Sequence, residues 1–364
     1  MNTYKLLTPG PLTTTEAVKK VMLEDRCTWD DDYKQITQTI RKQLVDLAEA
    51  NEAEYTSVLM QGSGSFVVES VLTTVVGEED KVLIITNGAY GERIVKMAQA
   101  LKLQHIVYSV PYNEQPSVLE VQALLENDPT ISHVTIVHCE TTTGMLNPIE
   151  EISEVVKATG KTYIVDAMSS FGGVPMDVPN LQIDFLISSA NKCIQGVPGF
   201  GFVIAKIEAL EKCKGQARSV ALDLYSQWEA MRVDGKWRFT SPTHVVAAFA
   251  KALEELIEEG GVQARYSRYV KNNEIVRSRL ATVGFDSYIS EAHQSPIITT
   301  FLFPHEKFSF KHFYDEMKKG GYVIYPGKLT DFDTFRIGNI GDVHEEDMKD
   351  LCEIIENYMA VTIK

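Results

Sequence analysis

The sequence is poor in cysteine and contains no long apolar run. Its 364 residues include five cysteines, an odd number, and no two of them form a Cys-x-x-Cys pair. A disulfide framework and a zinc site are therefore not expected, and no other metal site is predicted. No stretch reaches the roughly 18 apolar residues of a membrane span. The first residues contain no apolar segment typical of a signal peptide, so we expect a cytoplasmic protein.

An excess of positive charge is also missing. Lys and Arg total 35 against 50 Asp and Glu, which gives a formal net charge of −15. Binding of nucleic acid or of an anionic membrane surface needs concentrated Lys and Arg, so neither partner is expected. With 44% hydrophobic and 23% charged residues, the composition is that of an ordinary globular protein. The length is sufficient for two domains.

Apolar strand-like runs alternate with amphipathic helical stretches from residue 55 to about residue 205. This alternation predicts an α/β fold, with a mostly parallel sheet covered by helices. The predicted strands are 55–60, 81–86, 104–108, 133–137, 162–165, 185–187 and 201–205. The predicted helices between them include 66–76, 91–101 and 148–159.

The pattern changes after residue 205. A helix over 244–259 ends at Gly260-Gly261, and a smaller α+β domain follows. Its predicted strands are 297–302 and 322–325, and its predicted helices are 310–319 and 345–358. We therefore expect an N-terminal arm (1–20) that is irregular at 8–11, a large domain (21–261) and a small C-terminal domain (262–364).

One lysine and one aspartate stand at the ends of successive apolar runs. Asp166 follows the run 162–165, and Lys192 lies shortly after 185–187 among small and polar residues. Ligands of parallel sheets bind at the carboxyl ends of strands, so both side chains are expected at one cleft. A lysine that forms a Schiff base and an aspartate for a pyridinium nitrogen are what pyridoxal 5′-phosphate chemistry requires. A surface lysine and a helix-capping aspartate are the ordinary alternatives.

Three further segments follow predicted strands. Gln61-Gly62-Ser63-Gly64-Ser65 opens a helix and offers N–H groups and hydroxyls to a phosphate, or it is only a tight connection. It lacks the third glycine of a dinucleotide fingerprint and the lysine of a P-loop. In Glu140-Thr141-Thr142-Thr143-Gly144, the hydroxyls suit a cofactor or local backbone hydrogen bonds. Tyr90 is placed either to stack on a planar ring or to pack internally.

An arginine interrupts an apolar stretch of the small domain. Arg336 lies within 334–339, which is otherwise typical of a strand. Arginine is costly to bury unless it meets an anion, and its fork suits a carboxylate bidentately. The stretch predicts either a site for a substrate carboxylate or a structural salt bridge.

Together these segments resemble the class V, fold-type I aminotransferases along nearly the whole chain. The glycine-rich turn, the aspartate and the lysine are shared by the whole class. The segments 29–33 and 191–195 look specific to members that act on a phosphonate. The matching segments are 6–12, 28–33, 61–66, 140–144 and 189–199. The resemblance implies a large domain with a mostly parallel seven-stranded sheet and a smaller α+β C-terminal domain.

The resemblance also implies a role for each matched residue. Lys192 would hold pyridoxal 5′-phosphate covalently and move the proton, and Asp166 would pair with the ring nitrogen. Arg336 would bind the carboxylate of the keto acid. Thr240 would reach the cofactor from a partner subunit, which implies a homodimer with shared active sites, and the sequence leaves Thr243 open as the alternative. The other cofactor-binding residues would be Ser63, Gly64, Ser65 and Asn191 at the phosphate, Tyr90 stacked on the ring, and Thr141 at the ring edge. Ser65 departs from the Thr or His of many relatives.

The implied reaction is transamination of 2-aminoethylphosphonate with pyruvate, which gives phosphonoacetaldehyde and L-alanine in phosphonate degradation. Arg26 is a candidate partner for the phosphonate group, and an ordinary surface arginine is the alternative. Transamination of serine or alanine with glyoxylate or pyruvate is the nearest alternative, since the same cofactor residues would serve. A cysteine desulfurase-like lyase needs a nucleophilic cysteine on a mobile loop, whereas Cys352 falls in a helix-like run and Cys193 adjoins the lysine. A non-catalytic cofactor-binding protein is disfavoured because the lysine, the aspartate and the arginine are all present.

Overall fold

The central sheet contains seven strands in the part of the chain that the structure, a computed structural model, describes (residues 4–327, 329 and 331–362). Their order is β2-β10-β9-β8-β5-β3-β4. β10 is antiparallel to both of its neighbours, and the other pairs are parallel. This sheet confirms the predicted α/β fold. The strands are β2 (Tyr55–Gln61), β3 (Lys81–Thr86), β4 (Gln104–Ser109), β5 (Ile131–Val137), β8 (Thr162–Asp166), β9 (Phe185–Ser189) and β10 (Phe200–Lys206).

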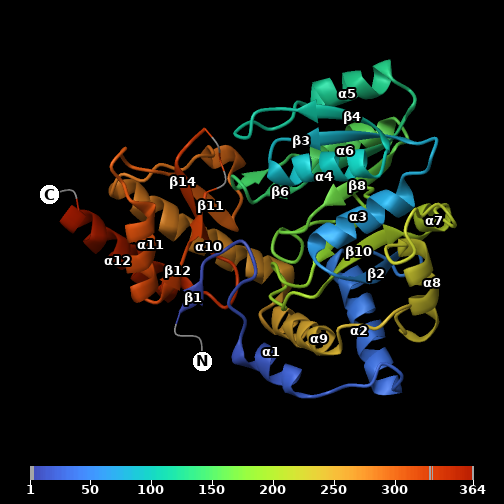
Figure 1. The fold of residues 1–364 in the computed structure, drawn as a ribbon, viewed down its shortest axis with the longest axis horizontal. Helices are drawn as coiled ribbons and strands as arrows, with labels where there is room; N and C mark the ends of the chain where they lie inside the picture. Colours follow the sequence, from blue (N-terminus) through green and yellow to red (C-terminus); the bar gives the residue numbers. More distant parts are fainter. Residues whose placement is uncertain (1–3, 328, 330, 363–364) are drawn as a thin grey trace.

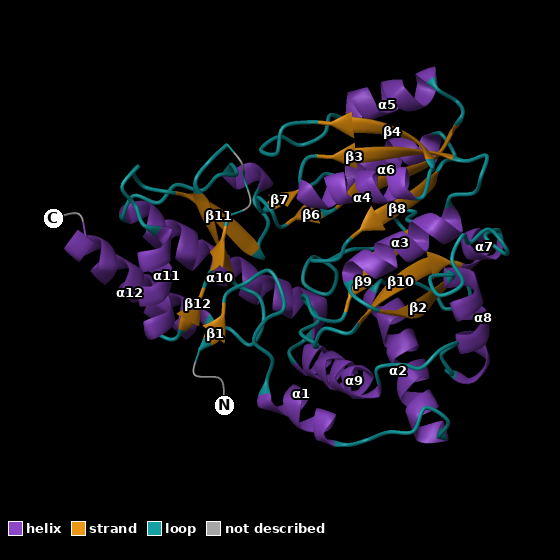
Figure 2. Cartoon of the chain, viewed as in Figure 1, coloured by secondary structure: helices purple, strands orange, loops and turns teal. Residues whose placement is uncertain are grey.

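Helices cover both faces of this sheet, because the central strands are apolar on both sides. In β8, Tyr163 and Val165 pack into one core and Ile164 packs into the other. Figures 1 and 2 show these two helical layers around the strands. The first core is completed by α2 (Asp31–Leu47), α5 (Val118–Asn127), α6 (Ile149–Ala158) and α9 (Thr243–Glu258). The second is completed by α3 (Gly64–Val75), α4 (Ala89–Ala100) and α8 (Leu224–Asp234).

A second group of elements, built mainly from the C-terminal part of the chain, has its own core. Its antiparallel sheet has the order β11-β14-β13 and packs with three helices. In Figure 1 it lies at the opposite end of the molecule from α7 (Ile207–Glu211) and α8. The elements are α10 (Gly261–Thr282), β11 (Ile298–Leu302), α11 (Phe310–Lys319), β13 (Tyr325–Pro326), β14 (Thr334–Gly338) and α12 (Glu345–Thr362).

The predicted strand over 322–325 is wrong in one respect, because it is two short strands in different sheets. β12 (Tyr322–Val323) pairs in parallel with β1 (Lys5–Leu6), whereas Tyr325 pairs with Arg336 of β14. Between them, Ile324 is fully buried in the core. The chain changes partner at this residue, and a run of apolar residues carries no signal for such a change.

Short elements complete the chain. They are α1 (Glu16–Lys20), the 3₁₀ turns 21–23 and 291–293, α7 (Ile207–Glu211), and the hairpin of β6 (Cys139–Glu140) with β7 (Met145–Leu146). The segment 8–11 is irregular, as expected. All five cysteines are free thiols. None of the described helices combines the length and apolarity that crossing a bilayer requires.

The topology brings several predicted site segments to one edge of the sheet. β2, β3, β8 and β9 all run in the same direction, so their carboxyl ends meet at that edge. The glycine-rich turn, Tyr90 and Lys192 come after β2, β3 and β9, and Asp166 is the last residue of β8. The site lies where ligands of such sheets are generally bound.

Candidate active site

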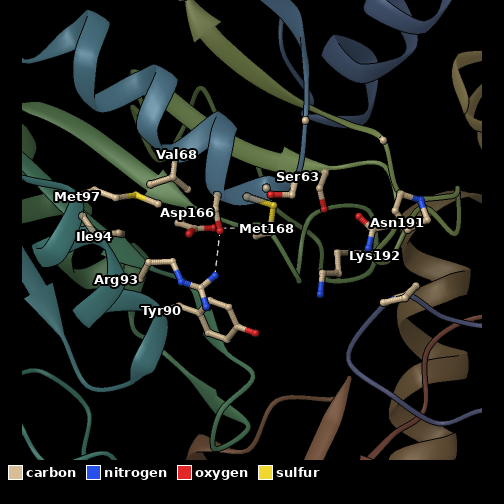
Figure 3. A pocket seen from close by; sticks show the side chains of 17 residues that line it. Ser63, Val68, Tyr90, Arg93, Ile94, Met97, Asp166, Met168, Asn191 and Lys192 are labelled. Carbon is tan, nitrogen blue, oxygen red and sulfur yellow. Dashed lines mark hydrogen bonds between the residues drawn. The ribbon is translucent and has the colours of Figure 1, made fainter. Parts of the chain in front are cut away.

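A pocket of about 680 Å³ opens at this edge of the sheet. Its volume lies in the range of small-molecule sites. Figure 3 shows Tyr90, Asp166 and Lys192 around the same cavity. The pocket is lined by seven of the predicted site residues, namely Ser63, Gly64, Ser65, Tyr90, Asp166, Asn191 and Lys192. The structure therefore brings most of the predicted site together, from four separate segments.

Asp166 is the last residue of β8 and is only 4% exposed. Its carboxylate accepts a hydrogen bond from the backbone N–H of Met168 at 2.9 Å. Burial raises the pKa of Asp166 to about 6, and the Met168 N–H, Lys192 and Arg93 oppose the rise. The ionised carboxylate thus lacks enough positive charge nearby, so a cationic ring nitrogen would be a favourable partner.

Lys192 lies in the loop after β9, beneath the N-terminal arm. Its Nζ donates a hydrogen bond to the carbonyl of Pro9 at 2.6 Å. Gly10 has a φ of +105°, and a Cβ there would lie 2.7 Å from Lys192 Cδ, so only glycine fits this close approach. Burial lowers the pKa of Lys192, and Tyr90, Cys193, Asp166 and Cys139 oppose the change. The environment therefore favours the neutral amine, which is the nucleophilic form.

The glycine-rich turn forms another wall of the pocket. Ser63 is the N-cap residue of α3, yet its side chain makes no capping hydrogen bond. The first backbone N–H groups of a helix lack acceptors within the helix and attract anions. Opposite the turn, Ser189 Oγ is buried and has no hydrogen-bond partner among the described residues. The turn and Ser189 thus offer unused donors to an anionic group.

Arg93 adds a cation to this wall. Its Nη1 donates a hydrogen bond to Ser65 Oγ at 3.0 Å, and its guanidinium lies 4.9 Å from the centre of the Tyr90 ring. No carboxylate of the described residues forms an ion pair with Arg93. Sequence reasoning missed Arg93 and Ser189. Arg93 stands three residues after Tyr90 on α4, so helical spacing alone predicts that the two side chains share a face.

Thr141 and Arg336 contact each other beside the pocket and do not line it. Arg336 is fully buried, and Nη1 donates to the carbonyl of Thr141 at 2.9 Å. Nε and Nη2 donate to the carbonyl of Pro326 at 3.1 and 3.0 Å. Burial lowers the pKa of Arg336, while Tyr90 and Tyr325 oppose the change. All three hydrogen bonds go to two neutral carbonyls, and no carboxylate of the described residues balances the charge of Arg336.

Thr240 and Arg26 lie away from the pocket. Thr240 is exposed in the segment between α8 and α9, where the next residue, Ser241, hydrogen-bonds the Tyr33 hydroxyl at 2.6 Å. The Arg26 guanidinium pairs with the Glu24 carboxylate at 2.5 Å and donates to nearby carbonyls. The pocket lining therefore offers no support for Arg26 as the phosphonate partner.

The residues present fit pyridoxal 5′-phosphate. The unpartnered hydroxyl of Ser189 and the start of α3 supply hydrogen-bond donors for the phosphate. The pocket also holds a lysine whose pKa is lowered by burial and a buried carboxylate. Tyr90 lines the same pocket and supplies an aromatic ring. This donor set matches the anionic end, the carbonyl and the basic nitrogen of that cofactor.

Comparison with known proteins agrees with this assignment. The family model described as aminotransferase class-V matches residues 26–319. The 2-aminoethylphosphonate–pyruvate transaminase of Lysinibacillus sphaericus (strain C3-41) is 76% identical over 361 residues, which cover 99% of each chain. The protein of the same name from Bacillus cereus (strain ATCC 14579) is 57% identical over 97% of each chain.

Solved structures show the same fold. Pyridoxamine-pyruvate aminotransferase from Mesorhizobium loti superimposes with a TM-score of 0.91 at 22% identity. The match covers 99% of this chain and 93% of the other. The extent of the family match and the identity to these relatives confirm the resemblance found in the sequence: the chain belongs to the class-V aminotransferase family.

Proposed function

We propose that this chain is a pyridoxal 5′-phosphate enzyme that transfers the amino group of 2-aminoethylphosphonate to pyruvate. The products are phosphonoacetaldehyde and L-alanine. One observation carries the proposal. A chain 76% identical to a 2-aminoethylphosphonate–pyruvate transaminase holds a half-buried lysine and a buried aspartate in a single pocket at the carboxyl edge of its sheet.

Lys192 is the residue that holds the cofactor and moves the proton. Its lowered pKa favours an amine that can attack a carbonyl, and the Pro9 carbonyl holds Nζ in place. When bound, pyridoxal phosphate supplies an electron-withdrawing ring that stabilises negative charge on the carbon bearing the amine. With the cofactor bound, Lys192 Nζ would be the base that takes the proton from the carbon bearing the amine and the acid that gives it back.

Asp166 keeps the ring nitrogen of the cofactor protonated. The carboxylate sits at the end of a rigid central strand, and its Met168 hydrogen bond fixes its orientation. A positive charge at hydrogen-bonding distance would stabilise the ionised form against its burial. The same pairing strengthens the electron-withdrawing character of the ring.

The phosphate end is held by Ser63, Gly64, Ser65 and Asn191, together with two residues found in the structure, Ser189 and Arg93. Hydroxyls and N–H groups bind phosphate oxygens, and a guanidinium beside them balances the charge. Tyr90 would stack on the ring, and Thr141 would interact with its edge. Of these, Arg93 is the only cation apart from Lys192 among the described residues that line the pocket.

Arg336 binds the anionic group of each substrate in turn. The pyruvate carboxylate is planar and the phosphonate is tetrahedral. Each can accept two hydrogen bonds from one guanidinium. The buried position of Arg336, with only neutral carbonyl acceptors, favours an arriving anion. The charge of Arg336 also interacts electrostatically with Tyr90. The residue that would bind the substrate is thereby coupled to the residue that would stack on the cofactor.

Assembly, location and domain limits form part of the same proposal. A homodimer would place Thr240 at the cofactor of its partner, and Phe239 and Trp29, 50% and 68% exposed, offer apolar surface near this segment. Each protomer would consist of the arm (1–20), the large domain (21–261) and the small domain (262–364). We expect the enzyme in the cytoplasm.

Product formation tests the proposed reaction. Holoenzyme is incubated with 2-aminoethylphosphonate and pyruvate, and alanine and phosphonoacetaldehyde are measured. Parallel reactions contain L-serine or L-alanine with glyoxylate. Higher kcat/KM for the phosphonate supports the proposal, whereas a preference for serine or alanine refutes it. Lys192→Ala serves as the inactive control.

A further inference from the structure

The start of α4 is held by a carboxylate from another segment. Glu140 lies in β6 and is fully buried. Its Oε1 accepts a hydrogen bond from the Gly91 N–H at 2.7 Å, and Oε2 accepts one from the Tyr90 N–H at 3.3 Å. N–H groups in the first turn of a helix have no acceptor within that helix. Glu140 therefore provides the hydrogen-bond acceptors for the N–H groups of Tyr90 and Gly91.

The local sequence is built to admit this carboxylate. The N-cap residue of α4 is Gly88, which provides no capping side chain. A Cβ at Gly88 would lie 2.4 Å from Glu140 Cδ, closer than real contacts allow. Glycine at this position thus gives Glu140 access to the helix, and a residue 52 positions later takes the place of an ordinary cap.

Burial makes Glu140 an expensive capping group. It forms no ion pair with a cation of the described residues. Burial raises its pKa to about 7, opposed by the N–H groups of Gly91 and Tyr90, while Asp166 and Glu92 add to the rise. A serine or asparagine N-cap would satisfy a helix without a buried charge. The fixed geometry is the feature that Glu140 adds.

The same turn also contacts Arg336. The Glu140 carbonyl accepts hydrogen bonds from the N–H groups of Thr143 at 3.2 Å and Gly144 at 2.8 Å, which close the turn. The next carbonyl, that of Thr141, accepts from Arg336 Nη1 at 2.9 Å. One closed turn therefore joins the backbone of Tyr90 to the side chain of Arg336.

We propose that Glu140 is a positioning residue that fixes the Tyr90 ring against the cofactor through its two hydrogen bonds to the start of α4. The inference rests on the proposed function, in which Tyr90 stacks on the cofactor ring. A stacking side chain contributes to binding only when its backbone is held at the right height and angle. Glu140 acts through Tyr90 and touches neither cofactor nor substrate.

A double-mutant cycle on cofactor affinity separates this role from a general effect on folding. The dissociation constant of pyridoxal phosphate is measured by equilibrium dialysis with the apoprotein of the wild type, Glu140→Gln, Tyr90→Ala and the double variant. The glutamine keeps one acceptor and presents an NH₂ group to the other N–H. We expect Glu140→Gln to weaken binding on the order of tenfold when Tyr90 is present and less than about twofold in the Tyr90→Ala background.

Two further variants guard the interpretation. Gly88→Ala displaces the carboxylate without removing it and should reproduce the loss of affinity only when Tyr90 is present. Asp184→Asn is the matched control, because Asp184 is a half-buried carboxylate that likewise accepts a hydrogen bond from a backbone N–H, that of Tyr163 at 2.8 Å, but lies at the opposite end of the sheet. It should leave cofactor affinity unchanged.

The outcomes are distinguishable. Equal losses from Glu140→Gln in both backgrounds, or unchanged affinity in the variant with Tyr90 present, overturn the positioning role. A Tyr90→Ala variant with wild-type affinity also overturns it, since no stacking contact would exist to position. A wild-type protein that fails to bind pyridoxal phosphate refutes the proposed function itself.

Discussion

Replacement of Asp166 by asparagine should make the apoprotein more stable and the holoenzyme inactive. Asparagine has nearly the same shape, and its carbonyl oxygen can still accept the Met168 N–H, which now lies 2.9 Å from the carboxylate. The change therefore removes a charge from the pocket without opening a cavity. What remains is the electrostatic cost of the buried carboxylate, without the ring nitrogen that would offset it.

The pKa of Asp166 sets the magnitude. A rise from 3.8 to about 6 means that ionisation in the folded apoprotein costs about 3 kcal/mol more than in the unfolded chain. Because the folded-state pKa is the higher one, the folded protein holds the proton more tightly. The stability that protonated Asp166 contributes to the folded apoprotein is fully present below about pH 4 and is lost as the pH rises through about 6. The neutral asparagine escapes this loss.

Urea unfolding of the apoprotein across pH 4 to 8, at one protein concentration, provides the assay. The free energy of unfolding of the variant should exceed that of the wild type only slightly near pH 4. Near pH 8 the difference should reach up to about 3 kcal/mol. In the holoenzyme the order should reverse, since the variant has lost the partner of the ring nitrogen. An Asp166→Asn apoprotein that is less stable than the wild type at pH 8 would refute the reasoning.

Three other substitutions probe the remaining parts of the site. Arg336→Gln should lower kcat/KM for pyruvate by about 10- to 100-fold, because a charged hydrogen bond is lost, whereas Arg26→Gln should leave it unchanged in the same steady-state assay. Arg93→Gln should weaken binding of pyridoxal phosphate on the order of tenfold but leave that of dephosphorylated pyridoxal unchanged, and a similar loss for both would contradict a phosphate contact. Arg232→Gln is its matched control, since Arg232 also lies 4.9 Å from an aromatic ring centre but outside the pocket. Ser189→Ala should bind pyridoxal phosphate several-fold more weakly without loss of apoprotein stability, and a lower melting temperature would instead indicate a structural role for this unpartnered hydroxyl.

Much of the fold could be predicted because its signals are local. Each of the seven strands is a short apolar run between turn residues, and the order of the runs already indicates a parallel sheet. Asp166 and Lys192 were found for the same reason, since Asp166 follows directly on such a run and Lys192 lies shortly after the next one. The rule that carboxyl ends of parallel strands share one edge then places them together.

The rest of the site depends on contacts between distant segments. The Ser189 hydroxyl lacks a hydrogen-bond partner among the described residues because of the way distant segments pack around it. Glu140 reaches the start of α4 from a hairpin that no periodic pattern in the sequence predicts. Thr141 was predicted for its hydroxyl, but its carbonyl makes the contact with Arg336. The division of 322–325 between two sheets likewise follows from pairing, which a single run of residues does not encode.

The spectral half-reaction tests the central claim most directly. Purified holoenzyme is mixed with 2-aminoethylphosphonate alone, and the absorbance of the lysine-linked cofactor is followed. We predict conversion to the aminated cofactor, reversal by pyruvate, and no conversion in Lys192→Ala. Conversion by alanine or serine but not by 2-aminoethylphosphonate would contradict the proposed donor, and an absorbance that no amine changes would contradict transamination.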